Sequence, residues 1–193
     1  MNRAIFFAEI RKTLFPRGLD QSQVDGVNAI LDAVEKAHTW ADAPMLAYPL
    51  ATVFHETAKT MQPIEEYGRG HGHPYGRPTG PFHKIYYGRG LVQLTWLAGY
   101  TKATVQLRAH GVIGADVDLV KNPELALRPD IAAAVLIYGL TEGWFTGKKL
   151  ADYIHPSGYA DYVNARRMVN GTDKAVMIAG YARDFEKAIR AAA

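Results

Sequence analysis

Three glutamates in the first half of the chain have the residue type and spacing that acid–base chemistry requires. Glu56 ends an apolar run at Phe54-His55-Glu56-Thr57, and Glu65 and Glu66 follow in a loop rich in glycine and proline. Hydrolysis of a glycosidic bond needs a carboxylic acid to protonate the leaving oxygen and a carboxylate to activate water or stabilise positive charge. Pairs of glutamates nine residues apart, such as Glu56 and Glu65, are common in proteins. The spacing alone therefore does not indicate a glycosidase, and further residues are needed to support one.

The surroundings of Glu56 and Glu65 assign the two chemical roles. Glu56 lies near the C-terminal end of a predicted helix and at the edge of its apolar stripe. Burial and the helix dipole both disfavour a negative charge there, so we expect Glu56 to be the protonated acid. Glu65 lies in a solvated loop, where we expect it to stay ionised and to act as the base.

Apolar periodicity predicts the helices that position these residues. They are expected over approximately residues 5–14, 24–34, 44–56, 96–110, 131–138, 150–154, 160–169 and 172–190. Pro49 would remove a hydrogen bond inside the third of them, so that helix is expected either to begin near Tyr48 or to kink. The run 131–138 is apolar on every side and is expected to be a buried spine of the core.

The segment from residue 61 to 89 has no helical period and is instead rich in glycine, proline and aromatic residues. A long loop of this kind inside a compact domain is usually functional or disordered, and its aromatic residues favour a functional loop. Short strands are expected around residues 85–87 and 91–94, where Val, Tyr and Leu cluster.

Composition indicates one soluble globular domain over residues 1–193, with the N-terminal helices of 1–43 packed on a core of 44–193. Apolar residues make up 48% of the 193 residues and charged residues 21%, and there is no cysteine for a disulfide or a thiolate site. Charges at Glu9, Arg11 and Lys12 interrupt any signal-peptide core, and no segment approaches about 20 consecutive apolar residues. We therefore expect synthesis in the cytoplasm and no integral membrane segment.

Four segments together carry a resemblance to a known family. They are Phe-His-Glu-Thr at 54–57, Tyr-Tyr-Gly-Arg-Gly-Leu-Val-Gln-Leu-Thr-Trp at 86–96, Asn-Pro-Glu-Leu-Ala at 122–126 and Arg-Arg-Met-Val-Asn-Gly at 166–171. In this order they resemble the landmarks of the glycoside hydrolase family 19 chitinases. The chain is most similar to the short, cysteine-free endolysins that bacteriophages and prophages build on that fold.

The resemblance implies a mainly α, lysozyme-like domain in which a small loop and β-hairpin lobe forms a cleft beside Glu56. It implies that Glu56 is the general acid, that Glu65 is the second carboxylate with Glu66 as a close rival, and that Thr95 holds the attacking water. The implied catalytic residues are thus Glu56, Glu65 and Thr95, and the implied substrate-binding residues are His55, Glu66, Tyr87, Gln93, Arg167 and Asn170.

The chain departs from the family pattern in three places. Ala58 and Lys59 replace the usual glycines after His-Glu-Thr, Gly99 replaces an asparagine, and the loop 68–81 has a histidine-rich sequence of its own. The first departure leaves the chemistry intact. The other two affect the choice of substrate, because those positions contact sugar.

We expect a peptidoglycan-degrading endolysin that cleaves the β-1,4 bond between N-acetylmuramic acid and N-acetylglucosamine without a cofactor. Its partner would be the peptidoglycan glycan strand and not nucleic acid, and the protein would act as a monomer. It would stay in the cytoplasm of the host bacterium until the membrane is permeabilised and would then reach the periplasm and cell wall. The alternatives are a chitinase and a non-catalytic glycan-binding module on the same fold.

Two other groups of residues have competing interpretations. His71, His73 and His83 could join His55 around a metal ion, but solvated loop histidines account for them better, and we predict no metal site. Trp96, Trp144 and Tyr138 are predicted to belong to the core. Tyr67, Tyr75 and Tyr87, in polar loop sequence, are predicted to contact sugar.

Overall fold

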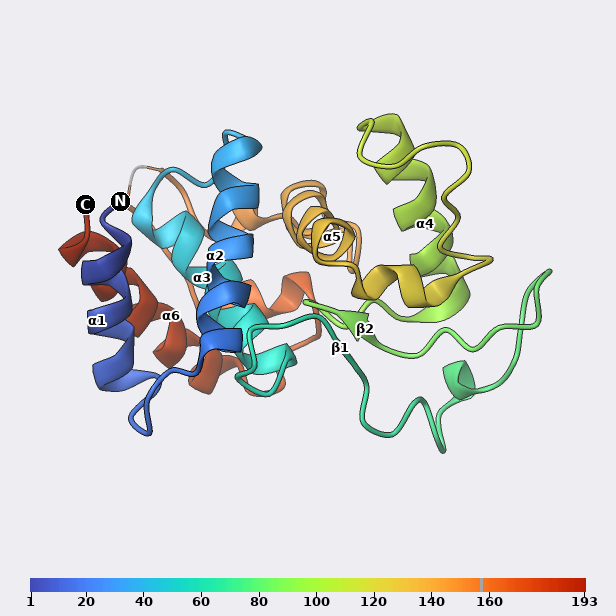
Figure 1. Cartoon of the computed structure of the whole chain (residues 1–193), viewed down its shortest axis with the longest axis horizontal. Coiled ribbons are helices and arrows are strands. Elements are labelled where there is room, and N and C mark those ends of the chain that lie inside the picture. Colours follow the sequence, from blue (N-terminus) through green and yellow to red (C-terminus); the bar gives the residue numbers. More distant parts are fainter. Residues whose placement is uncertain (157) are drawn as a thin grey trace.

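Helices make up most of the chain in the computed structural model, which describes residues 1–156 and 158–193. The α-helices are α1 (Arg3–Thr13), α2 (Gln21–Lys36), α3 (Ala43–Glu56), α4 (Trp96–Ala109), α5 (Pro129–Glu142) and α6 (Ala175–Ala191). Single 3₁₀ turns are η1 (Pro74–Gly76), η2 (Pro123–Leu127), η3 (Leu150–Asp152) and η4 (Asn164–Met168). The predicted mainly α fold class is confirmed (Figure 1).

Local sequence signals account for where these helices start. Asp20 accepts a hydrogen bond from the backbone of Gln23, whose side chain in turn accepts one from the backbone of Asp20, so a capping box opens α2. Pro44 lies in the first turn of α3, where a missing N–H costs nothing. The start of α3 at Ala43 shows that the alternative of a start near Tyr48 is wrong, because the buried Pro49 is accommodated inside the helix by tertiary packing.

The core forms where α3 packs along α6, and this pairing fixes the helix that carries Glu56. Phe54, two residues before Glu56, makes edge-to-face contacts with Phe15, Tyr181 and Phe185, with ring centroids 4.8–5.9 Å apart. The two N-terminal helices, α1 and α2, pack against α6 and α5 respectively. In Figure 1 the two chain ends lie side by side, and the backbone N–H of Asn2 donates to the carbonyl of Ala192.

The helix α5 is the buried spine that its apolar sequence predicts. Nine of its residues are buried, from Ile131 to Leu140. In Figure 1 it lies in the middle of the molecule, with α1, α2, α3 and α6 on one side and α4 on the other. Within the residues that the structure describes, no helix is both long and apolar enough to cross a membrane.

A lobe that consists mostly of loops projects from the helices between α3 and α4. Its two short strands, β1 (Ile64–Glu65) and β2 (Arg89–Gly90), pair antiparallel, with Ile64 opposite Gly90 and Glu65 opposite Arg89. The strands predicted at 85–87 and 91–94 are therefore wrongly placed. Tyr86 and Tyr87 precede β2 and are fixed by side-chain hydrogen bonds, and residues 91–93 form the turn that brings Leu94 back to Arg89.

The α3–α6 packing predicts a large loss of stability for Phe185→Ala. Phe185 is fully buried and contacts Phe6 and Phe54, so truncation removes about 3–5 kcal/mol from the free energy of unfolding. The control is Val176→Ala on the same helix, because Val176 is 74% exposed and its loss changes stability by no more than about 0.5 kcal/mol. Urea denaturation followed by circular dichroism measures both, and equal effects of the two substitutions would contradict this packing.

Candidate active site

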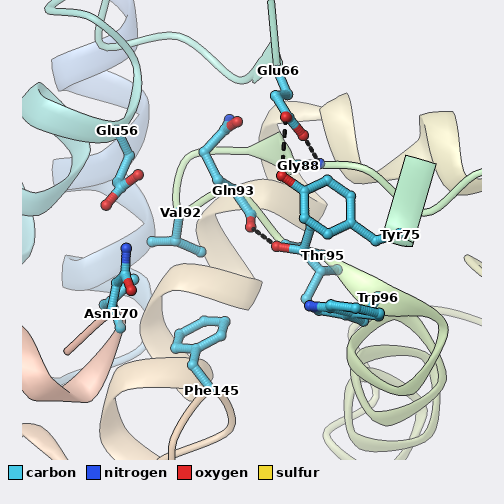
Figure 2. A pocket seen from close by; sticks show the side chains of 12 residues that line it. Glu56, Glu66, Tyr75, Gly88, Val92, Gln93, Thr95, Trp96, Phe145 and Asn170 are labelled. Atoms are coloured by element: carbon cyan, nitrogen blue, oxygen red, sulfur yellow. Dashed lines mark hydrogen bonds between the residues drawn. The ribbon is translucent and has the colours of Figure 1, made fainter. Parts of the chain in front are cut away.

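A cleft of about 520 Å³ lies between the end of α3 and the lobe. Its lining residues are Glu56, Glu66, Tyr75, Gly88, Val92, Gln93, Leu94, Thr95, Trp96, Phe145, Val169 and Asn170. Five of the nine residues predicted for the site are in this set: Glu56, Glu66, Gln93, Thr95 and Asn170. Figure 2 shows Glu56 and Asn170 on one side of the cleft and Glu66 on the other, with Val92 and Gln93 between them.

Glu56 is the last residue of α3, and a residue far along the chain holds its side chain. Arg166, on η4, donates from Nη1 to Glu56 Oε1 at 2.5 Å, and its Nε donates to the carbonyl of Asp173. Side-chain exposure is 15% for Glu56 and 3% for Arg166, so the ion pair is largely removed from water. The pair fixes the carboxyl group at the cleft wall with one edge open to the cavity.

Glu66 forms part of the opposite wall, and both of its carboxyl oxygens accept hydrogen bonds. Tyr75 donates its hydroxyl to Oε1 at 3.1 Å, and the backbone N–H of Gly88 donates to Oε2 at 3.0 Å (Figure 2). The backbone N–H of Glu66 also donates to the carbonyl of Gly88. These contacts hold an acceptor-rich carboxylate against the cavity.

Glu65 does not line the cleft and instead belongs to a charged cluster behind it. Tyr87 donates its hydroxyl to Glu65 Oε1 at 2.7 Å, Arg69 pairs with Oε2 at 2.9 Å, and Arg89 Nε lies 3.7 Å from Oε1. The Tyr87 hydrogen bond, followed by the two arginines, lowers the pKa of Glu65 below its ordinary value. Glu65 is therefore held in the ionised form, as its loop position predicts, but among the contacts that anchor the lobe.

Arg89 is the centre of the segment that resembles the chitinases, and it is buried. Its Nη1 donates to the carbonyl of Ile85 at 3.1 Å and to the hydroxyl of Tyr100 at 3.0 Å. The guanidinium carbon lies 3.6 Å from the centroid of the Tyr87 ring, a cation–π contact. Tyr86 donates its hydroxyl to the carbonyl of Val120, so the whole segment is tied to α4 and to the chain that follows it.

The floor of the cleft depends on an unusual backbone turn at Gln93. This residue has a φ of 54°, and its side-chain amide donates to the carbonyls of Ile64 and Gly90, both at 3.3 Å. A Cβ at position 88 would lie 2.6 Å from Gln93 Oε1, so a larger residue there would displace the Gln93 side chain. Thr95 donates its hydroxyl to the carbonyl of Gln93 at 2.8 Å, which leaves its oxygen lone pairs free to accept.

Aromatic side chains border the end of the cleft beside Glu66. Trp96 is 52% exposed, and its ring meets the Tyr75 ring edge to face with centroids 5.3 Å apart. His73 stacks on Tyr75, with ring centroids 4.9 Å apart. The prediction that Trp96 belongs to the core is wrong, because its φ of 65° turns it out of the apolar stripe of α4. Trp144, by contrast, is buried as predicted.

The remaining predicted residues lie outside the lining. Tyr87 is buried beneath Glu65, and His55 is half-buried, with burial lowering its pKa. Arg167 is exposed and donates to Asn164, so its neighbour Arg166 is the arginine that reaches Glu56. The sequence alone does not single out Arg166, since two adjacent arginines carry no local signal that separates the buried side chain from the exposed one.

Metal-binding side chains do not gather anywhere in residues 1–156 and 158–193: no three of His, Asp and Glu come together in the way that a cation site requires. His73 stacks on Tyr75, and His71 and His83 are exposed on the lobe.

Comparison with known proteins gives a likeness in structure. No protein-family model and no curated protein matches the sequence. The crystal structure of chitinase C from Streptomyces griseus HUT6037 is similar, with a TM-score of 0.59 and 23% identity over 96% of this chain and 75% of that chain. The crystal structure of a chitinase C mutant in which glutamine replaces a glutamate has a TM-score of 0.56 and 21% identity over the same shares. These likenesses confirm the predicted chitinase-like fold.

The cluster around Glu65 predicts a stability that depends on pH. Because the pKa of Glu65 is lowered in the folded state, its contribution is complete above the ordinary value of 4.5 and is lost as pH falls through the lower folded value. Tyr87→Phe should therefore cost roughly 1–2 kcal/mol at pH 7 and less at about pH 3. Urea denaturation at both pH values measures this difference. Tyr67→Phe is the control, since Tyr67 is 81% exposed, and a Tyr87→Phe cost that is the same at both pH values would refute the prediction.

Proposed function

We propose that this protein is a glycoside hydrolase that cleaves the β-1,4 bond between N-acetylmuramic acid and N-acetylglucosamine in peptidoglycan. The observation that carries the proposal is a cleft with Glu56 on one wall, Glu66 on the other and the Thr95 hydroxyl in its lining. An inverting glycosidase places its two carboxyl groups on opposite sides of the sugar, with room for a water molecule between the sugar and the base. Carboxyl groups on opposite walls of one cleft suit that arrangement.

In this mechanism Glu56 protonates the glycosidic oxygen as the bond to the anomeric carbon breaks. The proton transfer leaves a carboxylate on Glu56, and Arg166 at 2.5 Å stabilises that negative charge as it develops. Arg166 therefore favours the transition state over the protonated ground state, which is the differential stabilisation that catalysis requires. Asn170, beside Glu56, has an amide that suits the acetamido group common to both sugars.

The base activates a water molecule on the opposite face of the sugar ring. Thr95 donates its own proton to the carbonyl of Gln93, so toward the cavity it can only accept. A water that donates to Thr95 and to the base carboxylate directs a lone pair at the anomeric carbon. The two acceptors thereby orient the nucleophile as well as activating it.

We assign the base to Glu66. The family resemblance favours Glu65, but Glu66 lines the cleft with Glu56 and Thr95, whereas Glu65 is engaged by Tyr87, Arg69 and Arg89. A carboxylate held by two cations and a phenol is a weaker base, because each partner stabilises the form without the proton.

A chitinase is the second candidate function, and the likeness to a structure described as chitinase C favours it. The two activities act on the same β-1,4 linkage and differ in the sugar that carries the new reducing end. Mass spectrometry of purified peptidoglycan and of chitin oligomers after digestion distinguishes them. We expect new ends at N-acetylmuramic acid, and ends only at N-acetylglucosamine would favour the chitinase. A glycan-binding module would bind both polymers and release no reducing sugar.

The biological role that we propose is that of an endolysin. The protein would act as a monomer on the cell wall after the inner membrane is permeabilised, and its substrate would be the glycan strand. The net charge of +3 supports this role, because a positive protein is attracted to an anionic envelope. Loss of turbidity of permeabilised Gram-negative cells is the assay.

The acid role of Glu56 predicts that Glu56→Gln lowers the rate of wall hydrolysis by about 10²- to 10⁴-fold, or roughly 3–5 kcal/mol of activation free energy. Glutamine keeps the shape and cannot donate a proton at neutral pH. The matched control is Glu124→Gln, an exposed glutamate away from the cleft, which should keep the wild-type rate. A Glu56→Gln protein that is folded and fully active would refute the assignment.

The choice between the two adjacent carboxylates gives a further prediction. Glu66→Gln should lower kcat by at least about 10²-fold with little change in the unfolding midpoint, because Glu66 is the base. Glu65→Gln should lower the unfolding midpoint and leave kcat of the folded protein within about 10-fold, because Glu65 anchors the lobe. Kinetics and thermal denaturation of both variants decide the matter, and the reverse pattern would make Glu65 the base.

A further inference from the structure

A second hollow, of about 670 Å³, adjoins the cleft on the lobe side. Its lining residues are Pro74, Tyr75, Arg77, Pro78, Thr79, Tyr86, Trp96, Leu97 and Ala98. Tyr75 and Trp96 line both cavities, so the two are neighbours across this one aromatic pair. The hollow takes no part in the mechanism proposed above.

The chemistry of this hollow is apolar with a single cation. Two prolines, a leucine and three aromatic residues form most of its lining, and among the described residues that line it Arg77 is the only ionisable group apart from the tyrosines. The Arg77 side chain is exposed and makes no hydrogen bond or ion pair with any residue that the structure describes. A guanidinium without a partner beside apolar surface is suited to a carboxylate on an otherwise apolar ligand.

The net charge of the lobe is positive, like that of Arg77. Between Glu66 and Asp116 the sequence contains no acidic residue, whereas Arg69, Arg77 and Lys84 are all exposed on the lobe, along with three histidines. Only Arg69 among these three pairs with an acid, Glu65. The surface around the hollow is therefore positive and has no internal compensation for Arg77, which makes it complementary to an anionic ligand.

We infer that the second hollow binds the carboxylate-bearing peptide branch of the glycan strand, with Arg77 holding a peptide carboxylate. The inference rests on the proposed function, since a branch of this kind exists in peptidoglycan and not in chitin. An extended peptide spans about 3.3–3.6 Å per residue, so a branch of three residues reaches roughly 10 Å from its sugar. A sugar in the cleft beside the Tyr75–Trp96 pair would place such a branch at the boundary between the two cavities, since both residues line both of them.

Binding to catalytically inactive protein tests the inference. In a Glu56→Gln background, isothermal titration calorimetry compares a glycan fragment that carries its peptides with the same fragment after an amidase has removed them. The peptide-bearing fragment should bind about 10-fold more tightly, and Arg77→Gln should abolish this preference without weakening the stripped fragment. The matched control, Arg17→Gln, changes an exposed arginine outside the lobe and should keep the preference.

Two results would overturn the inference: equal affinity for both fragments before Arg77 is changed, or an equal loss for both fragments in Arg77→Gln. The proposed function is judged separately, by the action of the wild-type protein on the same two fragments. A peptide preference in binding without any cleavage would leave the inference standing and refute the hydrolase. Cleavage of both fragments without a peptide preference would do the reverse.

Discussion

The ion pair between Glu56 and Arg166 is the interaction on which the cleft depends. The two residues are 110 positions apart; Arg166 is buried, and Glu56 is 15% exposed at the wall of the cleft. Leaving the buried guanidinium of Arg166 without an acceptor would cost several kcal/mol, so this wall of the cleft requires η4 to pack against the end of α3. The apolar packing of α6 along α3 provides the driving force, because η4 and α6 follow one another and Arg166 also donates to Asp173, between them. The same contact that completes the fold therefore sets the position of the proposed acid.

The opposite wall depends on a second buried arginine. Arg89 joins the lobe to α4 through Tyr100, stacks on Tyr87 and approaches Glu65, while β1 and β2 share only two residue pairs. A two-residue ladder is too short to hold a wall by itself. The side-chain contacts of Arg89 stabilise this wall in place of a longer strand pairing. Gly88, Gln93 and Thr95 can therefore lie in irregular turns and still be held in fixed positions at the cleft.

The sequence predicts most of the helices and only part of the site, for physical reasons. Helices such as α2 and α5 are predicted because apolar period and caps are local properties. The choice between Glu65 and Glu66 depends on strand register, and a shift of one residue exchanges the faces of a strand. The exposure of Trp96 is not predictable, because its φ of 65° cannot be read from sequence. The sequence does not distinguish Arg166 from Arg167, because a partner 110 residues away leaves no periodic signal.

The chitinase-like fold by itself does not identify the substrate, because function depends on the residues of the site and not on the scaffold. In the proposed mechanism, Glu56, Glu66 and Thr95 act on a glycosidic bond and a water molecule, which chitin and peptidoglycan have in common. Only residues that contact the substituents of the sugar ring can distinguish the two polymers. Gly99 and the loop 68–81 are where this chain departs from the chitinase pattern, and that loop supplies Arg77 and part of the second hollow. The region that differs from the chitinase pattern is thus the region that we propose selects the substrate, and it is basic.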